Sequence, residues 1–328
     1  MEKVFVTGVA GFIGSKTVEF LLDDGVEVVG IDDMNDYYDI RIKQLRLQRV
    51  RASKNAENFT FIEGDIENLG LLEKTFKEHQ FDAVFNIAAR AGVRYSMVDP
   101  YVYVTTNTNA TLNLLECMRK NNVKKFLLSS TSSLYAGQQM PYTEDLPVNT
   151  PISPYAASKK AAEMLAYSYH HLYDIDVSVV RYFTVFGPAG RPDMNILRFI
   201  KWIDAGETIE LFGDGEQSRD FTYIDDVARG TIAAGKKMLG FEIINIGGGN
   251  NPISINQTIR WTEERLGKKA KIMNLPFHKA DMLETWADIS KAEKLLGWKP
   301  EIPVKDGMDR TFDDFIENAD FYRKIVLP

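Results

Sequence analysis

The sequence is poor in the residues that form disulfides and metal sites. Cys117 is the only cysteine among 328 residues, so no disulfide can form within the chain. This suits a reducing compartment, and we expect a cytoplasmic protein. The single cysteine and the four histidines (His79, His170, His171 and His278) show no zinc-ligand spacing, so we expect no metal.

Long apolar runs and an excess of positive charge are also missing. No apolar stretch approaches the roughly 20 residues that a membrane-spanning helix needs. With 39 basic and 46 acidic residues the net charge is −7, which gives no sign of a nucleic-acid or anionic-membrane partner. Residues 1–8 lead straight into an apolar segment and a glycine turn, so we expect no signal peptide.

The first half of the chain alternates short apolar segments with helical ones. Segments rich in Val, Ile and Phe predict strands at Val4–Thr7, Val26–Ile31, Phe59–Glu63, Ala83–Ile87, Lys125–Ser129 and Val177–Arg181. Helical patterns lie between and after them, near Ser15–Leu22, Ile40–Arg51, Leu69–Glu78, Thr105–Lys120 and Tyr155–Tyr173. This alternation predicts an α/β, Rossmann-type doubly wound parallel sheet with right-handed crossovers.

After about residue 183 the pattern loosens into turn clusters and further helical runs. These runs lie near Ile196–Ile203, Ser254–Leu266, Ile289–Leu296 and Met308–Asn318. We predict a Rossmann domain over residues 1–183 and a smaller C-terminal α/β domain over residues 184–328, with some of the chain crossing back to the first. Ligands of open α/β sheets bind beyond the carboxyl ends of the strands, where the cleft between the two parts would lie.

A glycine turn follows the first strand, with Gly8, Gly11 and Gly14 in the spacing Gly-x-x-Gly-x-x-Gly. Such glycines permit a tight turn and close approach to a pyrophosphate, and the N–H groups of the following helix face the anion. The triplet alone is weak, but Asp32 ends the second strand about 20 residues later. A carboxylate there accepts from ribose hydroxyls and repels a 2′-phosphate, which favours NAD over NADP. A simple turn aspartate is the alternative.

Other strand ends add polar residues to the same edge of the sheet. Asp65, after the third strand, can either reach the adenine or cap the following helix. Ala88, Ala89 and Arg90 end the fourth strand, where the chain should pass beneath the cofactor. The fifth strand ends in a run of hydroxyls, and Thr131 within it could hydrogen-bond a substrate oxygen and relay a proton. A polar turn explains that run as well.

Tyr155 and Lys159 stand four residues apart, which places them on one face of a helix. A free tyrosine has a pKa of about 10 and is a poor base at neutral pH. A neighbouring ammonium favours the phenolate, so the pair predicts a proton-handling site for hydride transfer. Taken alone, Tyr-x-x-x-Lys also fits a surface pair on an amphipathic helix.

Together, these residues resemble the extended short-chain dehydrogenase/reductase family over essentially the whole chain. The run Gln217–Ile224 is similar to the nucleotide-sugar branch, and Phe183–Met194 and Ser153–Glu163 look like UDP-glucuronate 4-epimerases. The resemblance implies a tightly held NAD, a UDP- or dTDP-linked sugar, and a homodimer formed through the helices near residues 105–120 and 155–173. It implies that the NAD site includes Phe12, Ile13, Asp33, Asn35, Ile66, Asn107, Ser129, Tyr155, Lys159 and Tyr182 besides the residues already named.

The resemblance also implies the substrate contacts. Thr184, Arg191 and Ser132 would bind the sugar carboxylate, and an arginine fork with hydroxyl donors suits that group. The remaining contacts would be Ser133, Arg219 on the diphosphate, Asp288 on the uridine ribose, Phe212 on the uracil and Asn195 on the nucleotide. Three departures from the family pattern stand out: Arg90 replaces a glutamine, His278–Asp281 replaces Gln-Pro-Gly-Asp, and Ala136 replaces a glycine.

The resulting hypothesis is reversible inversion at C4 of UDP-glucuronate to UDP-galacturonate through a 4-keto intermediate. Alternatives are a UDP-glucuronate decarboxylase, a UDP-glucose/UDP-galactose 4-epimerase, a 4,6-dehydratase, or a silent NAD-binding sensor or scaffold. The segment with Thr184 and Arg191 argues against the decarboxylase. Ser132 and Ser133 stand where dehydratases carry Asp-Glu, and intact Tyr155 and Lys159 argue against a silent protein.

Overall fold

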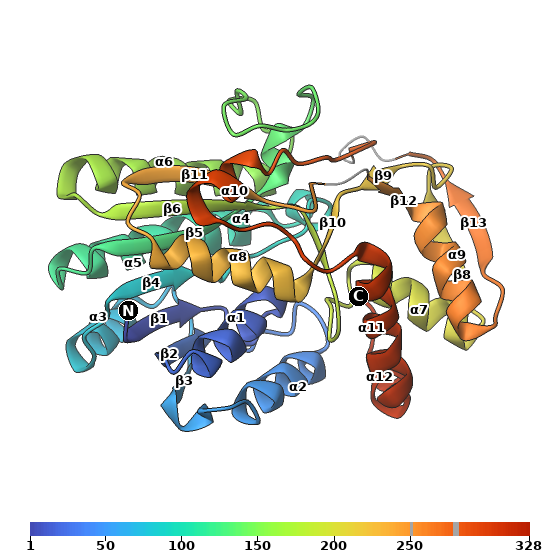
Figure 1. Cartoon of the computed structure of the whole chain (residues 1–328), viewed down its shortest axis with the longest axis horizontal. Coiled ribbons are helices and arrows are strands. Elements are labelled where there is room, and N and C mark those ends of the chain that lie inside the picture. Colours follow the sequence, from blue (N-terminus) through green and yellow to red (C-terminus); the bar gives the residue numbers. More distant parts are fainter. Residues whose placement is uncertain (250–251, 278–281) are drawn as a thin grey trace.

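A seven-stranded parallel sheet organises the chain (Figure 1), in a computed structural model that describes residues 1–249, 252–277 and 282–328. Its strand order is β11-β6-β5-β4-β1-β2-β3. The strands are β1 (Lys3–Thr7), β2 (Glu27–Asp32), β3 (Phe59–Glu63), β4 (Ala83–Asn86), β5 (Lys125–Thr131), β6 (Asp176–Tyr182) and β11 (Phe241–Ile246). The predicted doubly wound α/β fold is confirmed, and the strand order reverses between β1 and β4, where such sheets bind ligands.

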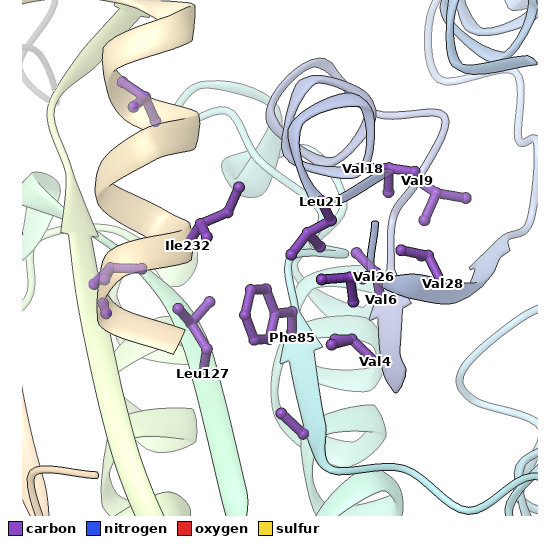
Figure 2. Packing of buried hydrophobic residues seen from close by; sticks show 14 of the residues in the cluster. Val4, Val6, Val9, Val18, Leu21, Val26, Val28, Phe85, Leu127 and Ile232 are labelled. Atoms are coloured by element: carbon purple, nitrogen blue, oxygen red, sulfur yellow. The ribbon is translucent and has the colours of Figure 1, made fainter. Parts of the chain in front are cut away.

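Helices cover both faces of this sheet, and the strands β1, β2, β4, β5 and β6 are therefore almost wholly buried. Along β1, Val4 and Val6 face α1 and α8, whereas Phe5 faces α3, α5 and α6. Figure 2 shows Val4 and Val6 packing beside Leu21 and Phe85. The helices are α1 (Phe12–Asp23), α2 (Ile40–Arg51), α3 (Leu69–Glu78), α4 (Pro100–Tyr103), α5 (Ala110–Lys120), α6 (Pro154–Tyr173) and α8 (Ile224–Lys236).

Smaller elements gather at one end of the sheet (Figure 1). Three two-stranded pairs occur there: β7 (Thr184–Phe186) with β10 (Phe221–Tyr223), β8 (Thr208–Phe212) with β13 (Lys271–Leu275), and β9 (Ser218–Arg219) with β12 (Ile253–Ser254). The helices at this end are α7 (Asn195–Ala205), α9 (Ile255–Leu266), α11 (Val304–Glu317) and α12 (Ala319–Lys324). In contrast, α8, α10 (Ser290–Leu296) and β11 also follow residue 183, but α8 and α10 pack on the main sheet and β11 joins it.

Most elements lie where the sequence predicts them, and two helices differ from the prediction. The helix expected near Thr105–Lys120 is present, but residues 104–109 form a π-helical turn and α5 itself begins at Ala110. The helix α8 was not predicted, and its Gly235 lies so close to the sheet that a Cβ would stand 2.0 Å from the Phe85 ring. Within the residues that the structure describes, no helix is long and apolar enough to span a membrane.

Candidate active site

A cavity of about 940 Å³ opens beyond the carboxyl ends of the strands. All the predicted site residues except Asn107 and Asp288 line it. From the main sheet and its loops come Gly8, Gly11, Phe12, Ile13, Gly14, Asp32, Asp33, Asn35, Asp65, Ile66, Ala88, Ala89, Arg90, Ser129, Thr131, Ser132, Ser133, Tyr155, Lys159 and Tyr182. From the later part of the chain come Thr184, Arg191, Asn195, Phe212 and Arg219. The arrangement brings the glycine turn and the Tyr155 helix to one space.

The glycine turn has the geometry that a dinucleotide pyrophosphate requires. Gly8 adopts a φ of +73°, and a Cβ on Gly14 would lie 2.0 Å from the Gly8 carbonyl oxygen, so neither position accepts a side chain. The helix α1 begins directly after Gly11, and no side chain caps its N-terminus or places an acid in its first turn. Its first N–H groups are therefore available to an anion, as NAD binding needs.

Asp32 lies at the end of β2 with both carboxylate oxygens held in place. Oδ2 accepts from the Ala10 N–H at 3.0 Å, which joins the aspartate to the glycine turn. Oδ1 accepts from the Met34 N–H at 3.0 Å and lies 3.4 Å from the ammonium of buried Lys43. The carboxylate is thus oriented at the cavity edge, with remaining lone pairs for ribose hydroxyls.

The ends of β3 and β4 form the next part of the wall. Asp65 accepts from the Glu67 N–H at 2.8 Å, and Asn68 caps α3 instead, so the capping alternative for Asp65 is wrong. Burial raises the pKa of Asp65. Arg90 donates to Asn35 Oδ1 at 3.1 Å. Asn107 does not line the cavity. Its side-chain amide accepts from the Arg90 N–H and donates to the Arg90 carbonyl.

Tyr155 and Lys159 project from α6 on the same face, as predicted. Lys159 donates to the carbonyl of Ser129 at 2.8 Å and to its hydroxyl at 3.2 Å, and burial lowers the pKa of this lysine to about 7. The pKa of Tyr155 is raised by burial, against a hydrogen bond with Thr131 and the charge of Arg191, which lower it. The pKa of Tyr155 therefore lies above that of a free tyrosine, and the groups that lower it are Thr131 and Arg191.

The hydroxyl run after β5 turns back on itself at the cavity wall. The Thr131 hydroxyl accepts from the Ser133 N–H at 3.1 Å, and Thr131 Oγ1 lies 3.1 Å from the Ser133 hydroxyl. Residues Ser132–Tyr135 form a short 3-10 helix that begins at this cap. Consequently Thr131, Ser132 and Ser133 all line the cavity beside Tyr155.

Arg191 enters the cavity from the loop that follows β7. Its Nε donates to Asp193 at 3.0 Å, and its Nη2 lies 3.4 Å from the Ala91 carbonyl and also bonds Asp193. Burial opposes the charge of Arg191, but Asp193 holds the pKa above its usual value, so the guanidinium stays positive. Its hydrogen bonds to described residues use Nε and Nη2.

Two arginines that line the cavity, each stacked on an aromatic ring, were not predicted. Arg94 lies 3.9 Å from the centre of the Phe212 ring, and Arg198 lies 4.4 Å from the Trp202 ring. The two positive charges repel each other. Burial and the charge of Arg94 both lower the pKa of Arg198. Arg198 was not predicted because the apolar spacing of α7 is typical of an amphipathic helix, in which an arginine at this position is expected to face solvent.

The remaining predicted substrate residues lie partly inside and partly outside the cavity. Asp288 does not line the cavity; its carboxylate accepts from the Ser290 N–H at 2.8 Å, in the turn before α10. The segment His278–Asp281, where the chain departs from the family pattern, lies outside the described residues. Arg219 lines the cavity and donates to the Ser218 carbonyl at 2.8 Å.

Comparisons with known proteins agree with this geometry. The model of the GDP-mannose 4,6 dehydratase family matches residues 5–311. The UDP-glucuronate 4-epimerase of Thermodesulfobacterium geofontis is 58% identical over 327 residues, which cover 100% of both chains. The crystal structure of UDP-glucuronic acid 4-epimerase from Bacillus cereus, in complex with UDP-glucuronic acid and NAD, has a TM-score of 0.89 at 39% identity, covering 96% of this chain and 99% of that one. The UDP-glucose 4-epimerase of Thermotoga maritima with UDP-glucose has a TM-score of 0.86 at 32% identity, covering 97% and 99%.

Proposed function

The chain belongs to the nucleotide-sugar branch of the extended short-chain dehydrogenase/reductase family, and we propose that it interconverts UDP-glucuronate and UDP-galacturonate by NAD-dependent inversion at C4. The observation that carries this proposal is the meeting of three groups in one cavity: the glycine turn, the Thr131–Tyr155 pair and the Arg191 guanidinium. Relatives that bind UDP-glucuronic acid and NAD support the same substrate and cofactor.

The two parts of the chain divide the ligands between them in this proposal. Residues 1–183 hold NAD, with the α1 N-terminus on the pyrophosphate and Asp32 on the adenosine ribose. Residues 184–328 bind the nucleotide sugar through Arg191 and Arg219, although β11 returns to the main sheet. Bound NAD supplies reversible acceptance of the C4 hydride. Asn107 does not line the cavity, and it contributes by fixing the backbone of Arg90 through hydrogen bonds to its N–H and carbonyl.

Proton transfer falls to Tyr155. As a phenolate, Tyr155 takes the proton of the C4 hydroxyl, with the Thr131 hydroxyl bridging the two oxygens. Because burial raises the pKa of Tyr155, the site needs positive charge to favour the phenolate, and Arg191 supplies part of it. Lys159, fixed by its bonds to Ser129, holds the nicotinamide ribose.

Arg191 has a second task in this reaction. Oxidation at C4 of a hexuronate gives a β-keto acid, which loses carbon dioxide when its C–CO₂ bond aligns with the ketone π system. Arg191, Thr184 and Ser132 would hold the carboxylate out of that alignment. The half-buried fork of Arg191, already oriented by Asp193, suits this role because it loses little freedom on binding.

Product analysis tests the proposal. The protein, with NAD, is incubated separately with UDP-glucuronate and UDP-glucose, and the sugars are identified by NMR. We expect UDP-galacturonate from the first substrate, no pentose, and little change in the second. Release of a UDP-pentose would indicate a decarboxylase, and preferential conversion of UDP-glucose would indicate the other epimerase. Tyr155→Phe is the control that should bind the substrate without converting it.

We also propose that the protein is a homodimer formed through α5 and α6. Large apolar side chains are exposed on these two helices, among them Leu112, Met164, Tyr167 and Leu172. Exposed apolar patches of this kind mark interfaces. Light scattering at micromolar concentration should give twice the chain mass; a monomer that turns over normally would contradict the dimer.

We place the protein in a reducing compartment, the cytoplasm, and the buried, free thiol of Cys117 fits that placement.

A further inference from the structure

Ala189, in the loop that carries Arg191, is held in an unfavourable conformation by side chains from two directions. It has a φ of +52°, in the left-handed region that L side chains rarely adopt, and it is buried. Its N–H donates to Tyr322 Oη at 3.1 Å and lies 3.3 Å from Asp314 Oδ2. Its carbonyl accepts from Arg46 Nε at 2.9 Å. Such conformations persist where the surroundings over-determine them.

Arg46, on α2, connects this loop to the cofactor turn. Its Nη1 donates to the Ala10 carbonyl at 3.2 Å and to Tyr38 Oη at 2.7 Å, and the guanidinium lies over the Phe12 ring. Ala10 is the residue whose N–H bonds the Asp32 carboxylate. One guanidinium therefore joins the backbone of the NAD-binding turn to the backbone two residues before Arg191.

The placement of Arg46 is unfavourable for stability alone. Its side chain is 1% exposed, its hydrogen bonds to described residues end on two carbonyls and a hydroxyl, and its Nη2 is buried without a partner there. A buried cation without an anionic partner is costly, and an apolar side chain would fill the space at less cost. This points to a role in geometry, since the planar fork can reach two carbonyls at once.

We propose that Arg46 is a positioning residue that fixes Arg191 for recognition of the substrate carboxylate. The clamp on Ala189, made by Arg46 on the carbonyl and by Tyr322 and Asp314 on the N–H, sets the direction in which the loop enters the cavity. Loss of the clamp leaves the nucleotide contacts in place but lets Arg191 move. The inference rests on the proposed function, because it concerns the carboxylate of the sugar.

The test compares Arg46→Met with Arg51→Met, which removes the same charge from the same helix at an exposed site over the Phe61 ring. Affinities for UDP-glucuronate and UDP are measured by calorimetry on protein saturated with NAD. Arg46→Met should bind UDP-glucuronate about 10- to 100-fold more weakly and UDP within about 3-fold of wild type, as expected for loss of a charge-assisted contact. Arg51→Met should match wild type, and Arg46→Lys should recover part of the loss.

Equal losses for UDP and UDP-glucuronate, or no loss for either, would overturn the inference. Should Arg46→Met not fold, Tyr322→Phe decides the question, because it removes only the hydroxyl that bonds the Ala189 N–H and Asp314. That variant should weaken UDP-glucuronate selectively, by about 2- to 10-fold, the size of a neutral hydrogen bond. Unchanged selectivity would then refute the clamp. A wild-type protein that does not prefer UDP-glucuronate over UDP-glucose would instead refute the proposed function.

Discussion

Replacement of Arg191 by alanine probes the proposed contact with the sugar carboxylate. In the structure Asp193 holds the guanidinium through Nε and Nη2, and the proposed function gives Nη1 to the sugar carboxylate. A charge-assisted hydrogen bond is worth about 1.5–3 kcal/mol, so Arg191→Ala should weaken UDP-glucuronate binding about 10- to 150-fold. The Asp193 carboxylate, left without its partner, adds like-charge repulsion to that loss.

The same change should alter the products. With the carboxylate no longer held, part of the oxidised intermediate should lose carbon dioxide before the hydride returns. Each such event leaves a UDP-4-keto-pentose and one NADH. We therefore expect Arg191→Ala to accumulate NADH in proportion to the carbon dioxide released, while wild type accumulates neither. Arg191→Lys, which keeps the charge but not the fork, should fall between the two.

NADH absorbance and NMR of the sugars, followed in one reaction, measure this outcome. Affinity for UDP-glucose serves as the internal control, because that ligand lacks the carboxylate and should bind the variant as it binds wild type. An Arg191→Ala protein that epimerises UDP-glucuronate at the wild-type rate, with no NADH formed, would refute the assignment of Arg191.

Three further predictions follow from buried charges. Glu163→Gln removes the bidentate partner of buried Arg181 and should cost about 3–5 kcal/mol of unfolding free energy in denaturant titrations, whereas Lys160→Gln should cost under about 1 kcal/mol. Because burial lowers the folded-state pKa of Lys159 from 10.5 to about 7, the unfolded chain binds more protons between these values. The stability of nucleotide-free wild type should therefore rise with pH across that window relative to Lys159→Met, and parallel pH curves would contradict this. Asp32→Ala leaves Lys43 without its nearest carboxylate and should raise the NADP-to-NAD affinity ratio, an effect that competition binding measures and that an unchanged ratio would exclude.

The periodic features of the chain were predictable. Ile40–Arg51, Leu69–Glu78 and Phe59–Glu63 match α2, α3 and β3 residue for residue, because capping residues and apolar spacing mark their ends. The glycine turn and Tyr155 face one cavity because parallel strands deliver their carboxyl ends to the same edge. These features depend on local sequence and on the handedness of the crossovers.

Features that depend on contacts between distant segments were not predictable. Asp288 and Asn107 have side chains suited to a ligand, but within the part of the chain that the structure describes their hydrogen bonds go to the protein backbone and to Ser158. The pKa of Tyr155 depends on how deeply the fold buries the ring, which helical spacing does not report. Arg46 reads as one of several arginines in an amphipathic helix, and only the tertiary structure brings it to Ala189, 143 positions along the chain.

The central claim is that one carbon gives up a hydride and receives it back within a single site. UDP-glucuronate carrying deuterium at C4 tests it most directly, with wild-type protein, unlabelled NAD and ordinary water. The UDP-galacturonate formed should retain the deuterium at C4, and NMR should find none elsewhere in the sugar. Loss of the label to solvent, or product formed with hydrogen at C4, would contradict the account.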